Sequence, residues 1–154
     1  MFMKLLMPLL FLLSAAILPG CMPADDKAIV NKHAEAYLTN QNELQFRFKL
    51  NSQILSGEEL FKVKVLIHNQ KLAKALGTKE IIYGAESVYD GEYMEAEENG
   101  EEKMVYMEPI PLKQDLLSSD IERMVSMDQA VSVEVYNDQK VIAEAYLTNF
   151  STQF

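Results

Sequence analysis

Apolar and polar residues alternate strictly in three stretches of the chain, the pattern of a strand with one buried face. From Leu44 to Leu50 every second residue is apolar, and the residues between are polar or charged. The stretch Phe61 to Ile67 follows the same rule with one extra leucine, and Val131 to Val135 repeats it. Because the second and third stretches are also rich in β-branched residues, which disfavour helix, we predict strands at all three.

The third stretch leads into a predicted hairpin. Residues 137–139, Asn-Asp-Gln, supply a loop, and residues 140–147 return as the partner strand. A three-residue loop places Val135 opposite Val141 and keeps the apolar side chains on one side. A shorter loop would place Val135 against Lys140 instead.

The middle of the chain has the pattern of a meander of three strands. Two dipeptides, Asp90-Gly91 and Asn99-Gly100, supply the positive φ angles that a tight hairpin turn requires. The strands that they separate are predicted at Ile81–Tyr89, Glu92–Glu98 and Glu101–Glu108.

One helix is predicted after the meander. Ser119 and Glu122 have the spacing of a capping box, and Ile121, Met124 and Val125 fall on one helical face. With seven to nine strands in all, the fold class is mainly β: an antiparallel β-sandwich or small barrel with one short helix.

One sequence of seven residues occurs twice, near the beginning and near the end of the predicted domain. Ala34 to Asn40 reads AEAYLTN, and the same seven residues recur from Ala143 to Asn149. If both copies are strands, Ala, Ala and Leu point inward and Glu, Tyr and Thr point outward. We predict that the first and last strands are neighbours. An alternative makes residues 26–39 a helix, because Ala, Glu, Lys and Leu are good helix formers.

The first 20 residues have the three parts of a signal peptide. Lys4 is the only charge, an apolar run extends from Leu5 to Leu18, and Pro19-Gly20 follows. A membrane-spanning helix needs roughly 20 apolar residues, and this run is shorter and ends in a helix-breaking pair.

The residues at the end of this leader, Leu18-Pro19-Gly20-Cys21, resemble the lipobox of bacterial lipoproteins. The resemblance implies that Cys21 becomes the first residue of the mature protein and carries fatty chains such as palmitate. Several chains on one residue give stable membrane anchoring. By the same resemblance, Met22 rather than aspartate after the cysteine implies the periplasmic face of the outer membrane. An ordinary secretory leader, cut after a residue such as Ala16, is the alternative.

These features divide the chain into a lipoprotein signal peptide (1–20), a lipidated N-terminus and tether (21–28), and a β-sandwich periplasmic domain (29–154). Without the leader, 13 basic and 23 acidic residues remain. The net charge of −10 argues against nucleic acid and anionic headgroups, and favours a basic protein or a divalent cation. Cys21 is the only cysteine, so no disulfide forms within the chain.

The residues available for catalysis are few. The chain has two histidines, His33 and His68, and no G-x-S-x-G motif. We interpret both histidines as structural and predict no enzyme activity. Met104 and Met107, and Met124 and Met127, have M-x-x-M spacing, and thioethers suit Cu(I). The first pair would point to opposite faces of a strand, and the second could share a helical face, although core filling is the commoner use of methionine.

The acidic run in the meander is the candidate binding site. A two-residue turn at Asn99-Gly100 would place Glu98 opposite Glu101 and Glu97 opposite Glu102, and like charges across a ladder repel. A bound Ca²⁺ could offset that repulsion, but the spacing is not that of an EF-hand, so no cofactor and no metal site is assigned. We interpret the run as a partner-binding surface made of Glu95, Glu97, Glu98, Glu101 and Glu102.

The sequence therefore predicts a lipid-anchored, non-enzymatic binding or assembly module of the outer membrane that acts through protein–protein contacts. One alternative is an inhibitor or immunity lipoprotein whose acidic hairpin occludes a cationic enzyme. Another is a Ca²⁺-dependent binding domain.

Overall fold

A computed structural model describes residues 29, 34–51, 55, 60–85, 91–95 and 102–153. The predicted signal peptide and Cys21 lie outside the described residues, as do His33 and the turn at Asn99-Gly100.

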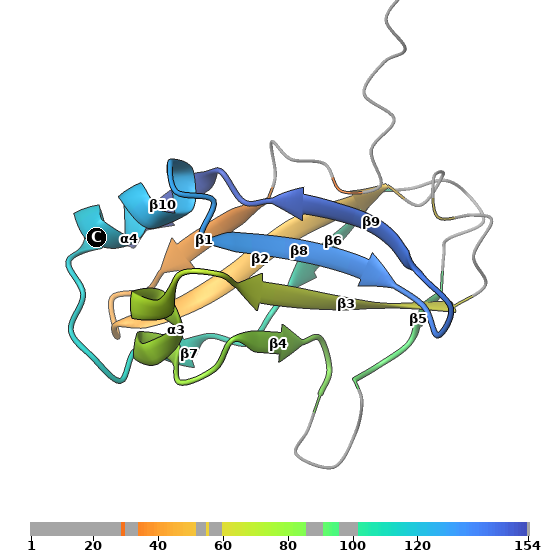
Figure 1. The fold of residues 1–154 in the computed structure, drawn as a ribbon, viewed down its shortest axis with the longest axis horizontal. Helices are drawn as coiled ribbons and strands as arrows, with labels where there is room; N and C mark the ends of the chain where they lie inside the picture. Colours follow the sequence, from red (N-terminus) through yellow and green to blue (C-terminus); the bar gives the residue numbers. More distant parts are fainter. Residues whose placement is uncertain are drawn as a thin grey trace, which may run out of the picture.

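Two β-sheets make up the body of the protein, as Figure 1 shows, and this confirms the predicted sandwich. The described strands form open sheets with free edges, not a closed barrel. The first sheet has the order β10-β1-β2-β6, with β7 also paired to β2, and the second has the order β4-β3-β8-β9, with β5 also paired to β3. The strands of the first sheet are β1 (Glu35–Leu38), β2 (Glu43–Asn51), β6 (Glu102–Tyr106), β7 (Ile110–Pro111) and β10 (Asn149–Thr152). Those of the second are β3 (Leu60–Ile67), β4 (Glu80–Ile82), β5 (Met94–Glu95), β8 (Val131–Tyr136) and β9 (Val141–Tyr146).

The core lies between the sheets and follows the alternation in the sequence. The apolar side chains of β2 are all fully buried, whereas the polar residues between them are partly exposed. β3 contributes the opposite wall through Phe61, Val63, Val65 and Ile67. The predicted strands over 44–50, 61–67 and 131–135 are therefore confirmed, each with one face in the core.

The hairpin of β8 and β9 forms, but its predicted register is wrong. Val135 lies opposite Ala143 rather than Val141, with an irregularity between Val135 and Tyr136. The Asn137 side chain accepts hydrogen bonds from the backbone N–H groups of residues 139 and 140, each at 2.9 Å, which sets a wider turn than three residues. From Ala143 onward the register is shifted by two positions, so the alanines of β9 keep the predicted face, whereas Val141 lies opposite Tyr136 and is exposed.

The first and last described strands are neighbours, but the last one is β10 and not the strand predicted from the second AEAYLTN copy. β1 pairs in parallel with β10, so that Glu35 lies opposite Asn149, and antiparallel with β2. The helix alternative for residues 26–39 is wrong at β1, and Ile29 forms a bridge with Leu50. The second copy of the AEAYLTN sequence lies mainly in β9, in the other sheet, with its two alanines also facing inward.

The predicted meander does not form. β4 and β5 both pair with β3 in the second sheet, whereas β6 pairs with β2 in the first. The Asp90-Gly91 dipeptide has the expected positive φ at Gly91, of 92°. The Asp90-Gly91 dipeptide thus precedes a change of direction, but β5 and β6 pair with β3 and β2 rather than with each other.

Two helices are described, where one was expected. The predicted helix is α4 (Ser118–Ser126), and Ile121, Met124 and Val125 are its buried residues. The capping box is wrong, because α4 begins after Leu117 and has no side-chain cap, which leaves Ser119 inside the helix.

The second helix, α3 (Gln70–Leu76), was not predicted. Asn69 caps it by accepting hydrogen bonds from the N–H groups of Lys71 and Leu72 at 2.9 and 3.1 Å. It ends at Gly77, whose φ of 76° is the left-handed conformation that favours glycine.

Candidate functional site

The residues predicted to bind a partner are only partly described. Glu97, Glu98 and Glu101 lie outside the described residues. Glu95 and Glu102 are both exposed, but they lie in different sheets, where Glu95 is opposite Leu60 in β3 and Glu102 is opposite Asn51 in β2. Glu102 also forms an ion pair with Lys49. These two carboxylates therefore belong to different strand pairs rather than to one ladder.

The histidine and methionine candidates occupy ordinary structural positions. His68 Nε2 lies 2.8 Å from the Oγ of Ser132, which is fully buried. Met104 is exposed and Met107 is buried, which confirms that they point to opposite faces. Met124 is buried, whereas Met127 is 78% exposed, so they do not share a helical face as suggested.

A cleft lies where the edges of the two sheets separate. One wall comes from β4 and the turn after it, and the other from the end of β6 and the segment leading to β7. Its volume is about 500 Å³. We call this feature the edge cleft, and its lining residues are Ile81, Ile82, Tyr83, Gly84, Ala85, Glu92, Tyr106, Met107, Glu108 and Ile110.

Backbone geometry holds Glu92 in the edge cleft. The Glu92 N–H donates to the Tyr83 carbonyl at 3.1 Å, and the Glu92 side chain packs over Gly84, where a Cβ would lie 2.5 Å from its Cγ. Gly91 makes the same close approach to Ile82, with a positive φ. These two glycines let the segment from Gly91 to Glu92 lie against the turn after β4.

Tyr93 fixes the same segment on its other side. Its hydroxyl donates to both carboxylate oxygens of Asp138, at 2.7 and 2.9 Å. The ammonium of Lys62, a residue that is only 7% exposed, lies 4.3 Å from the centre of the Tyr93 ring. The position of Glu92 therefore depends on contacts with both β3 and the β8–β9 loop.

The chemistry of the edge cleft is mixed. Six of its lining residues are large and apolar or aromatic, and Glu92 and Glu108 are the only charged ones. Such a cleft suits a ligand that has both apolar groups and positive charge. Because β4 and β6 are edge strands among the described elements, their backbone groups also border it.

A second cluster covers the outer face of the first sheet. The guanidinium of Arg47 lies 3.5 Å from the centre of the Tyr37 ring and 5.9 Å from that of Tyr106. Its Nε donates to Gln45 at 2.7 Å, and Glu35 lies 3.6 Å away. Arg47 thus links the three strands β1, β2 and β6, and one of its partners, Tyr106, also lines the edge cleft.

An ion-pair ladder crosses the outer face of the second sheet. The ammonium of Lys64 lies 2.9 Å from Glu134 and 4.0 Å from Glu80. The hydrogen bond to Glu134 is the main reason that the pKa of Lys64 is above its ordinary value of 10.5, and attraction to both carboxylates adds to it. These charged groups pair with one another within the sheet, so we interpret the ladder as a structural feature.

The described residues hold no group of three or more His, Cys, Asp or Glu side chains placed to bind a metal ion. None of the described helices is both long and apolar enough to cross a membrane. Comparisons with protein-family models, curated proteins and solved structures find no match to this chain.

The edge cleft could not be found from the sequence. Its residues come from segments far apart in the chain, and the predicted meander would have placed 81–108 in one sheet. The signals that were available are Gly84 and Gly91, which mark close backbone approaches on either side of the segment between them.

Proposed function

We propose that this protein is a lipid-anchored, non-enzymatic binding module that holds a protein partner at the periplasmic face of the outer membrane. Anchoring rests on the lipobox-like residues ending at Cys21. The observation that supports partner binding is the edge cleft, which is lined by six apolar or aromatic residues and two carboxylates between two sheet edges.

The proposed partner segment is an extended peptide that carries basic and apolar side chains. An extended peptide can hydrogen bond to an exposed sheet edge, while its side chains enter neighbouring pockets. Glu92 and Glu108 would pair with its basic groups. The protein has 23 acidic and 14 basic residues, and this net negative charge would speed association with a basic peptide.

Photo-crosslinking in the native envelope tests the site. A photoreactive phenylalanine analogue at Tyr106, which is 57% exposed and lines the edge cleft, should give one dominant crosslinked partner. The same analogue at Glu122, exposed on α4, should not capture that partner. Equal capture from the two positions would contradict the assignment of the cleft.

Charge reversal provides a second test with a matched control. The variant Glu92→Lys with Glu108→Lys should lose the partner that wild type captures. The variant Asp115→Lys with Glu122→Lys changes the net charge equally at exposed positions outside the cleft and should retain it. If both variants lose capture, net charge rather than the cleft is responsible.

The anchor is tested separately. Cys21→Ser should move the protein from the membrane fraction to the soluble periplasm, because the residue that would carry the lipid is gone. A variant that still sediments with membranes would refute acylation at Cys21, whatever the crosslinking shows.

A further inference from the structure

Basic charge is concentrated in one segment of this acidic protein. Residues 60–79 contain five lysines and no aspartate or glutamate, although acidic residues outnumber basic ones by 23 to 14 in the whole chain. Two of these lysines, Lys62 and Lys64, contact residues of the second sheet, and Lys71 pairs with Asp120 at 2.9 Å. The two remaining lysines are Lys74, in the last turn of α3, and Lys79, which follows the helix.

A third lysine joins them from another part of the chain. The Lys113 N–H donates to the Ala75 carbonyl at 2.7 Å, and its ammonium lies against Gly77, in the space that a Cβ would need. Lys74, Lys79 and Lys113 form no ion pair with any residue in the described part of the chain. Three ammonium groups that have no ionic partner among the described residues therefore lie around the C-terminal end of α3.

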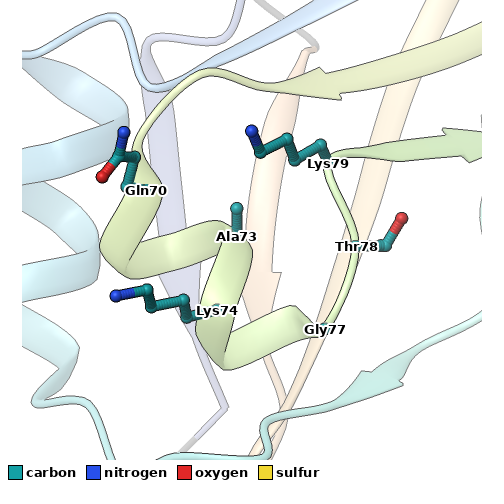
Figure 2. A pocket seen from close by; sticks show the side chains of 6 residues that line it. All are labelled: Gln70, Ala73, Lys74, Gly77, Thr78 and Lys79. Carbon is teal, nitrogen blue, oxygen red and sulfur yellow. The ribbon is translucent and has the colours of Figure 1, made fainter.

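An open pocket of about 610 Å³ lies among them, lined by Gln70, Ala73, Lys74, Gly77, Thr78 and Lys79. Pockets that hold small ligands usually have volumes of roughly 300–1,000 Å³. Figure 2 shows the Lys79 side chain extending back over the helix toward Ala73, whereas Lys74 leaves the helix on another side. The flexible four-carbon stems of lysines allow such ammonium groups to converge on a bound anion.

The negative end of the helix dipole would oppose an anion here. Two of the helix carbonyls are already occupied, because Ala73 accepts from the Gly77 N–H at 2.8 Å and Ala75 accepts from Lys113. α3 is only seven residues long, and three lysines lie around this end. The electrostatic potential around this end of the helix is therefore positive.

We propose that this pocket binds a small, soluble phosphate monoester. Lysine binds phosphate as a point charge, and Lys74 and Lys79 both line the pocket. A phosphate monoester carries about −1.5 to −2 charges at pH 7, which matches several ammonium groups better than one carboxylate does. Four of the six lining residues carry a polar or charged group that can hydrogen bond to a small phosphate ester.

Titration of the isotope-labelled full chain tests the proposal by NMR. Glycerol 3-phosphate should shift the amide signals of Ala73, Gly77 and Thr78 in a saturable way, and acetate at equal ionic strength should not. No saturable shift at these amides up to 20 mM glycerol 3-phosphate, a concentration on the order of the weakest specific binding worth detecting, would overturn the proposal.

Variants separate the pocket from general electrostatics. Lys74→Gln combined with Lys79→Gln should weaken glycerol 3-phosphate binding at least tenfold, whereas Lys103→Gln combined with Lys140→Gln, with the same change in net charge, should leave it within about twofold. Equal losses in both variants would refute the site. Binding of short-chain phosphatidic acid without binding of glycerol 3-phosphate would refute a soluble ligand in favour of a lipid.

Discussion

Removal of the Asn69 side chain should destabilise the protein measurably, although Asn69 was not recognised as a helix cap from the sequence. Its side-chain oxygen accepts hydrogen bonds from the N–H groups of Lys71 and Leu72, which have no partner within α3. Asn69→Ala leaves both groups without this acceptor, while the backbone of the helix is unchanged.

The magnitude follows from the geometry of the cap. Replacement of an N-cap asparagine by alanine costs about 0.5–2 kcal/mol, and typically about 1 kcal/mol. Two well-formed hydrogen bonds favour the upper half of that range, so we expect a loss of about 1–2 kcal/mol in the free energy of unfolding. For a domain of this size that corresponds to a fall in Tm of roughly 3–8 °C.

Ser119→Ala is the matched control. The sequence alone assigns Ser119 as a helix cap, but it lies inside α4 and makes no capping hydrogen bond. Since alanine has the higher helix propensity, this variant should be unchanged or up to about 0.5 kcal/mol more stable. Urea unfolding monitored by circular dichroism measures both variants. A larger loss for Ser119→Ala than for Asn69→Ala would refute the assignment of the caps.

Three further predictions concern the two sheets. Phe48→Ala, which removes a fully buried side chain from β2, should lower the free energy of unfolding by about 3–5 kcal/mol in urea, and a loss below 1 kcal/mol would contradict the core. Arg47→Met should cost about 1–2 kcal/mol by the same assay, because it removes a contact with the Tyr37 ring and a hydrogen bond to Gln45, and an unchanged midpoint would argue against both. Because the pKa of Lys64 is raised on folding, its ion pair stabilises the fold fully below pH 10.5 and less as the pH rises through the folded-state value. The Tm difference between wild type and Lys64→Met should therefore stay constant from pH 8 to about pH 10 and shrink above pH 10.5, and a difference that stays constant above pH 10.5 would count against the ion pair.

The sequence predicted the strands that have a single buried face. In β2 and β8 the apolar residues recur with a period of two, and β3 follows the same period from Phe61 onward except at Leu66, so a strand buries nearly all of these apolar residues on one face. The face of α4 was predictable for the same reason, from Ile121, Met124 and Val125. Local patterns were sufficient wherever burial alone decides the element.

Strand pairing and the register were less predictable. The turn at Asn137 shifts the pairing of Ala143 and Ala145 by two residues, which keeps both alanines on the inner face, so the hydrophobic pattern does not distinguish the two registers. Similarly, β5 and β6 are short, and either could pair locally or with a distant strand. Their partners are determined by tertiary packing. The edge cleft, which depends on those partners, was therefore beyond the reach of sequence patterns.

The parallel pairing of β1 with β10 has a consequence for the timing of folding. Glu35 lies beside Asn149, so the first sheet is incomplete until both β1 and the distant β10 are available to pair. Contacts between such distant segments slow folding, because a long loop must close before they form. A chain that is made from its N-terminus would therefore keep this sheet unfinished until β10 has emerged.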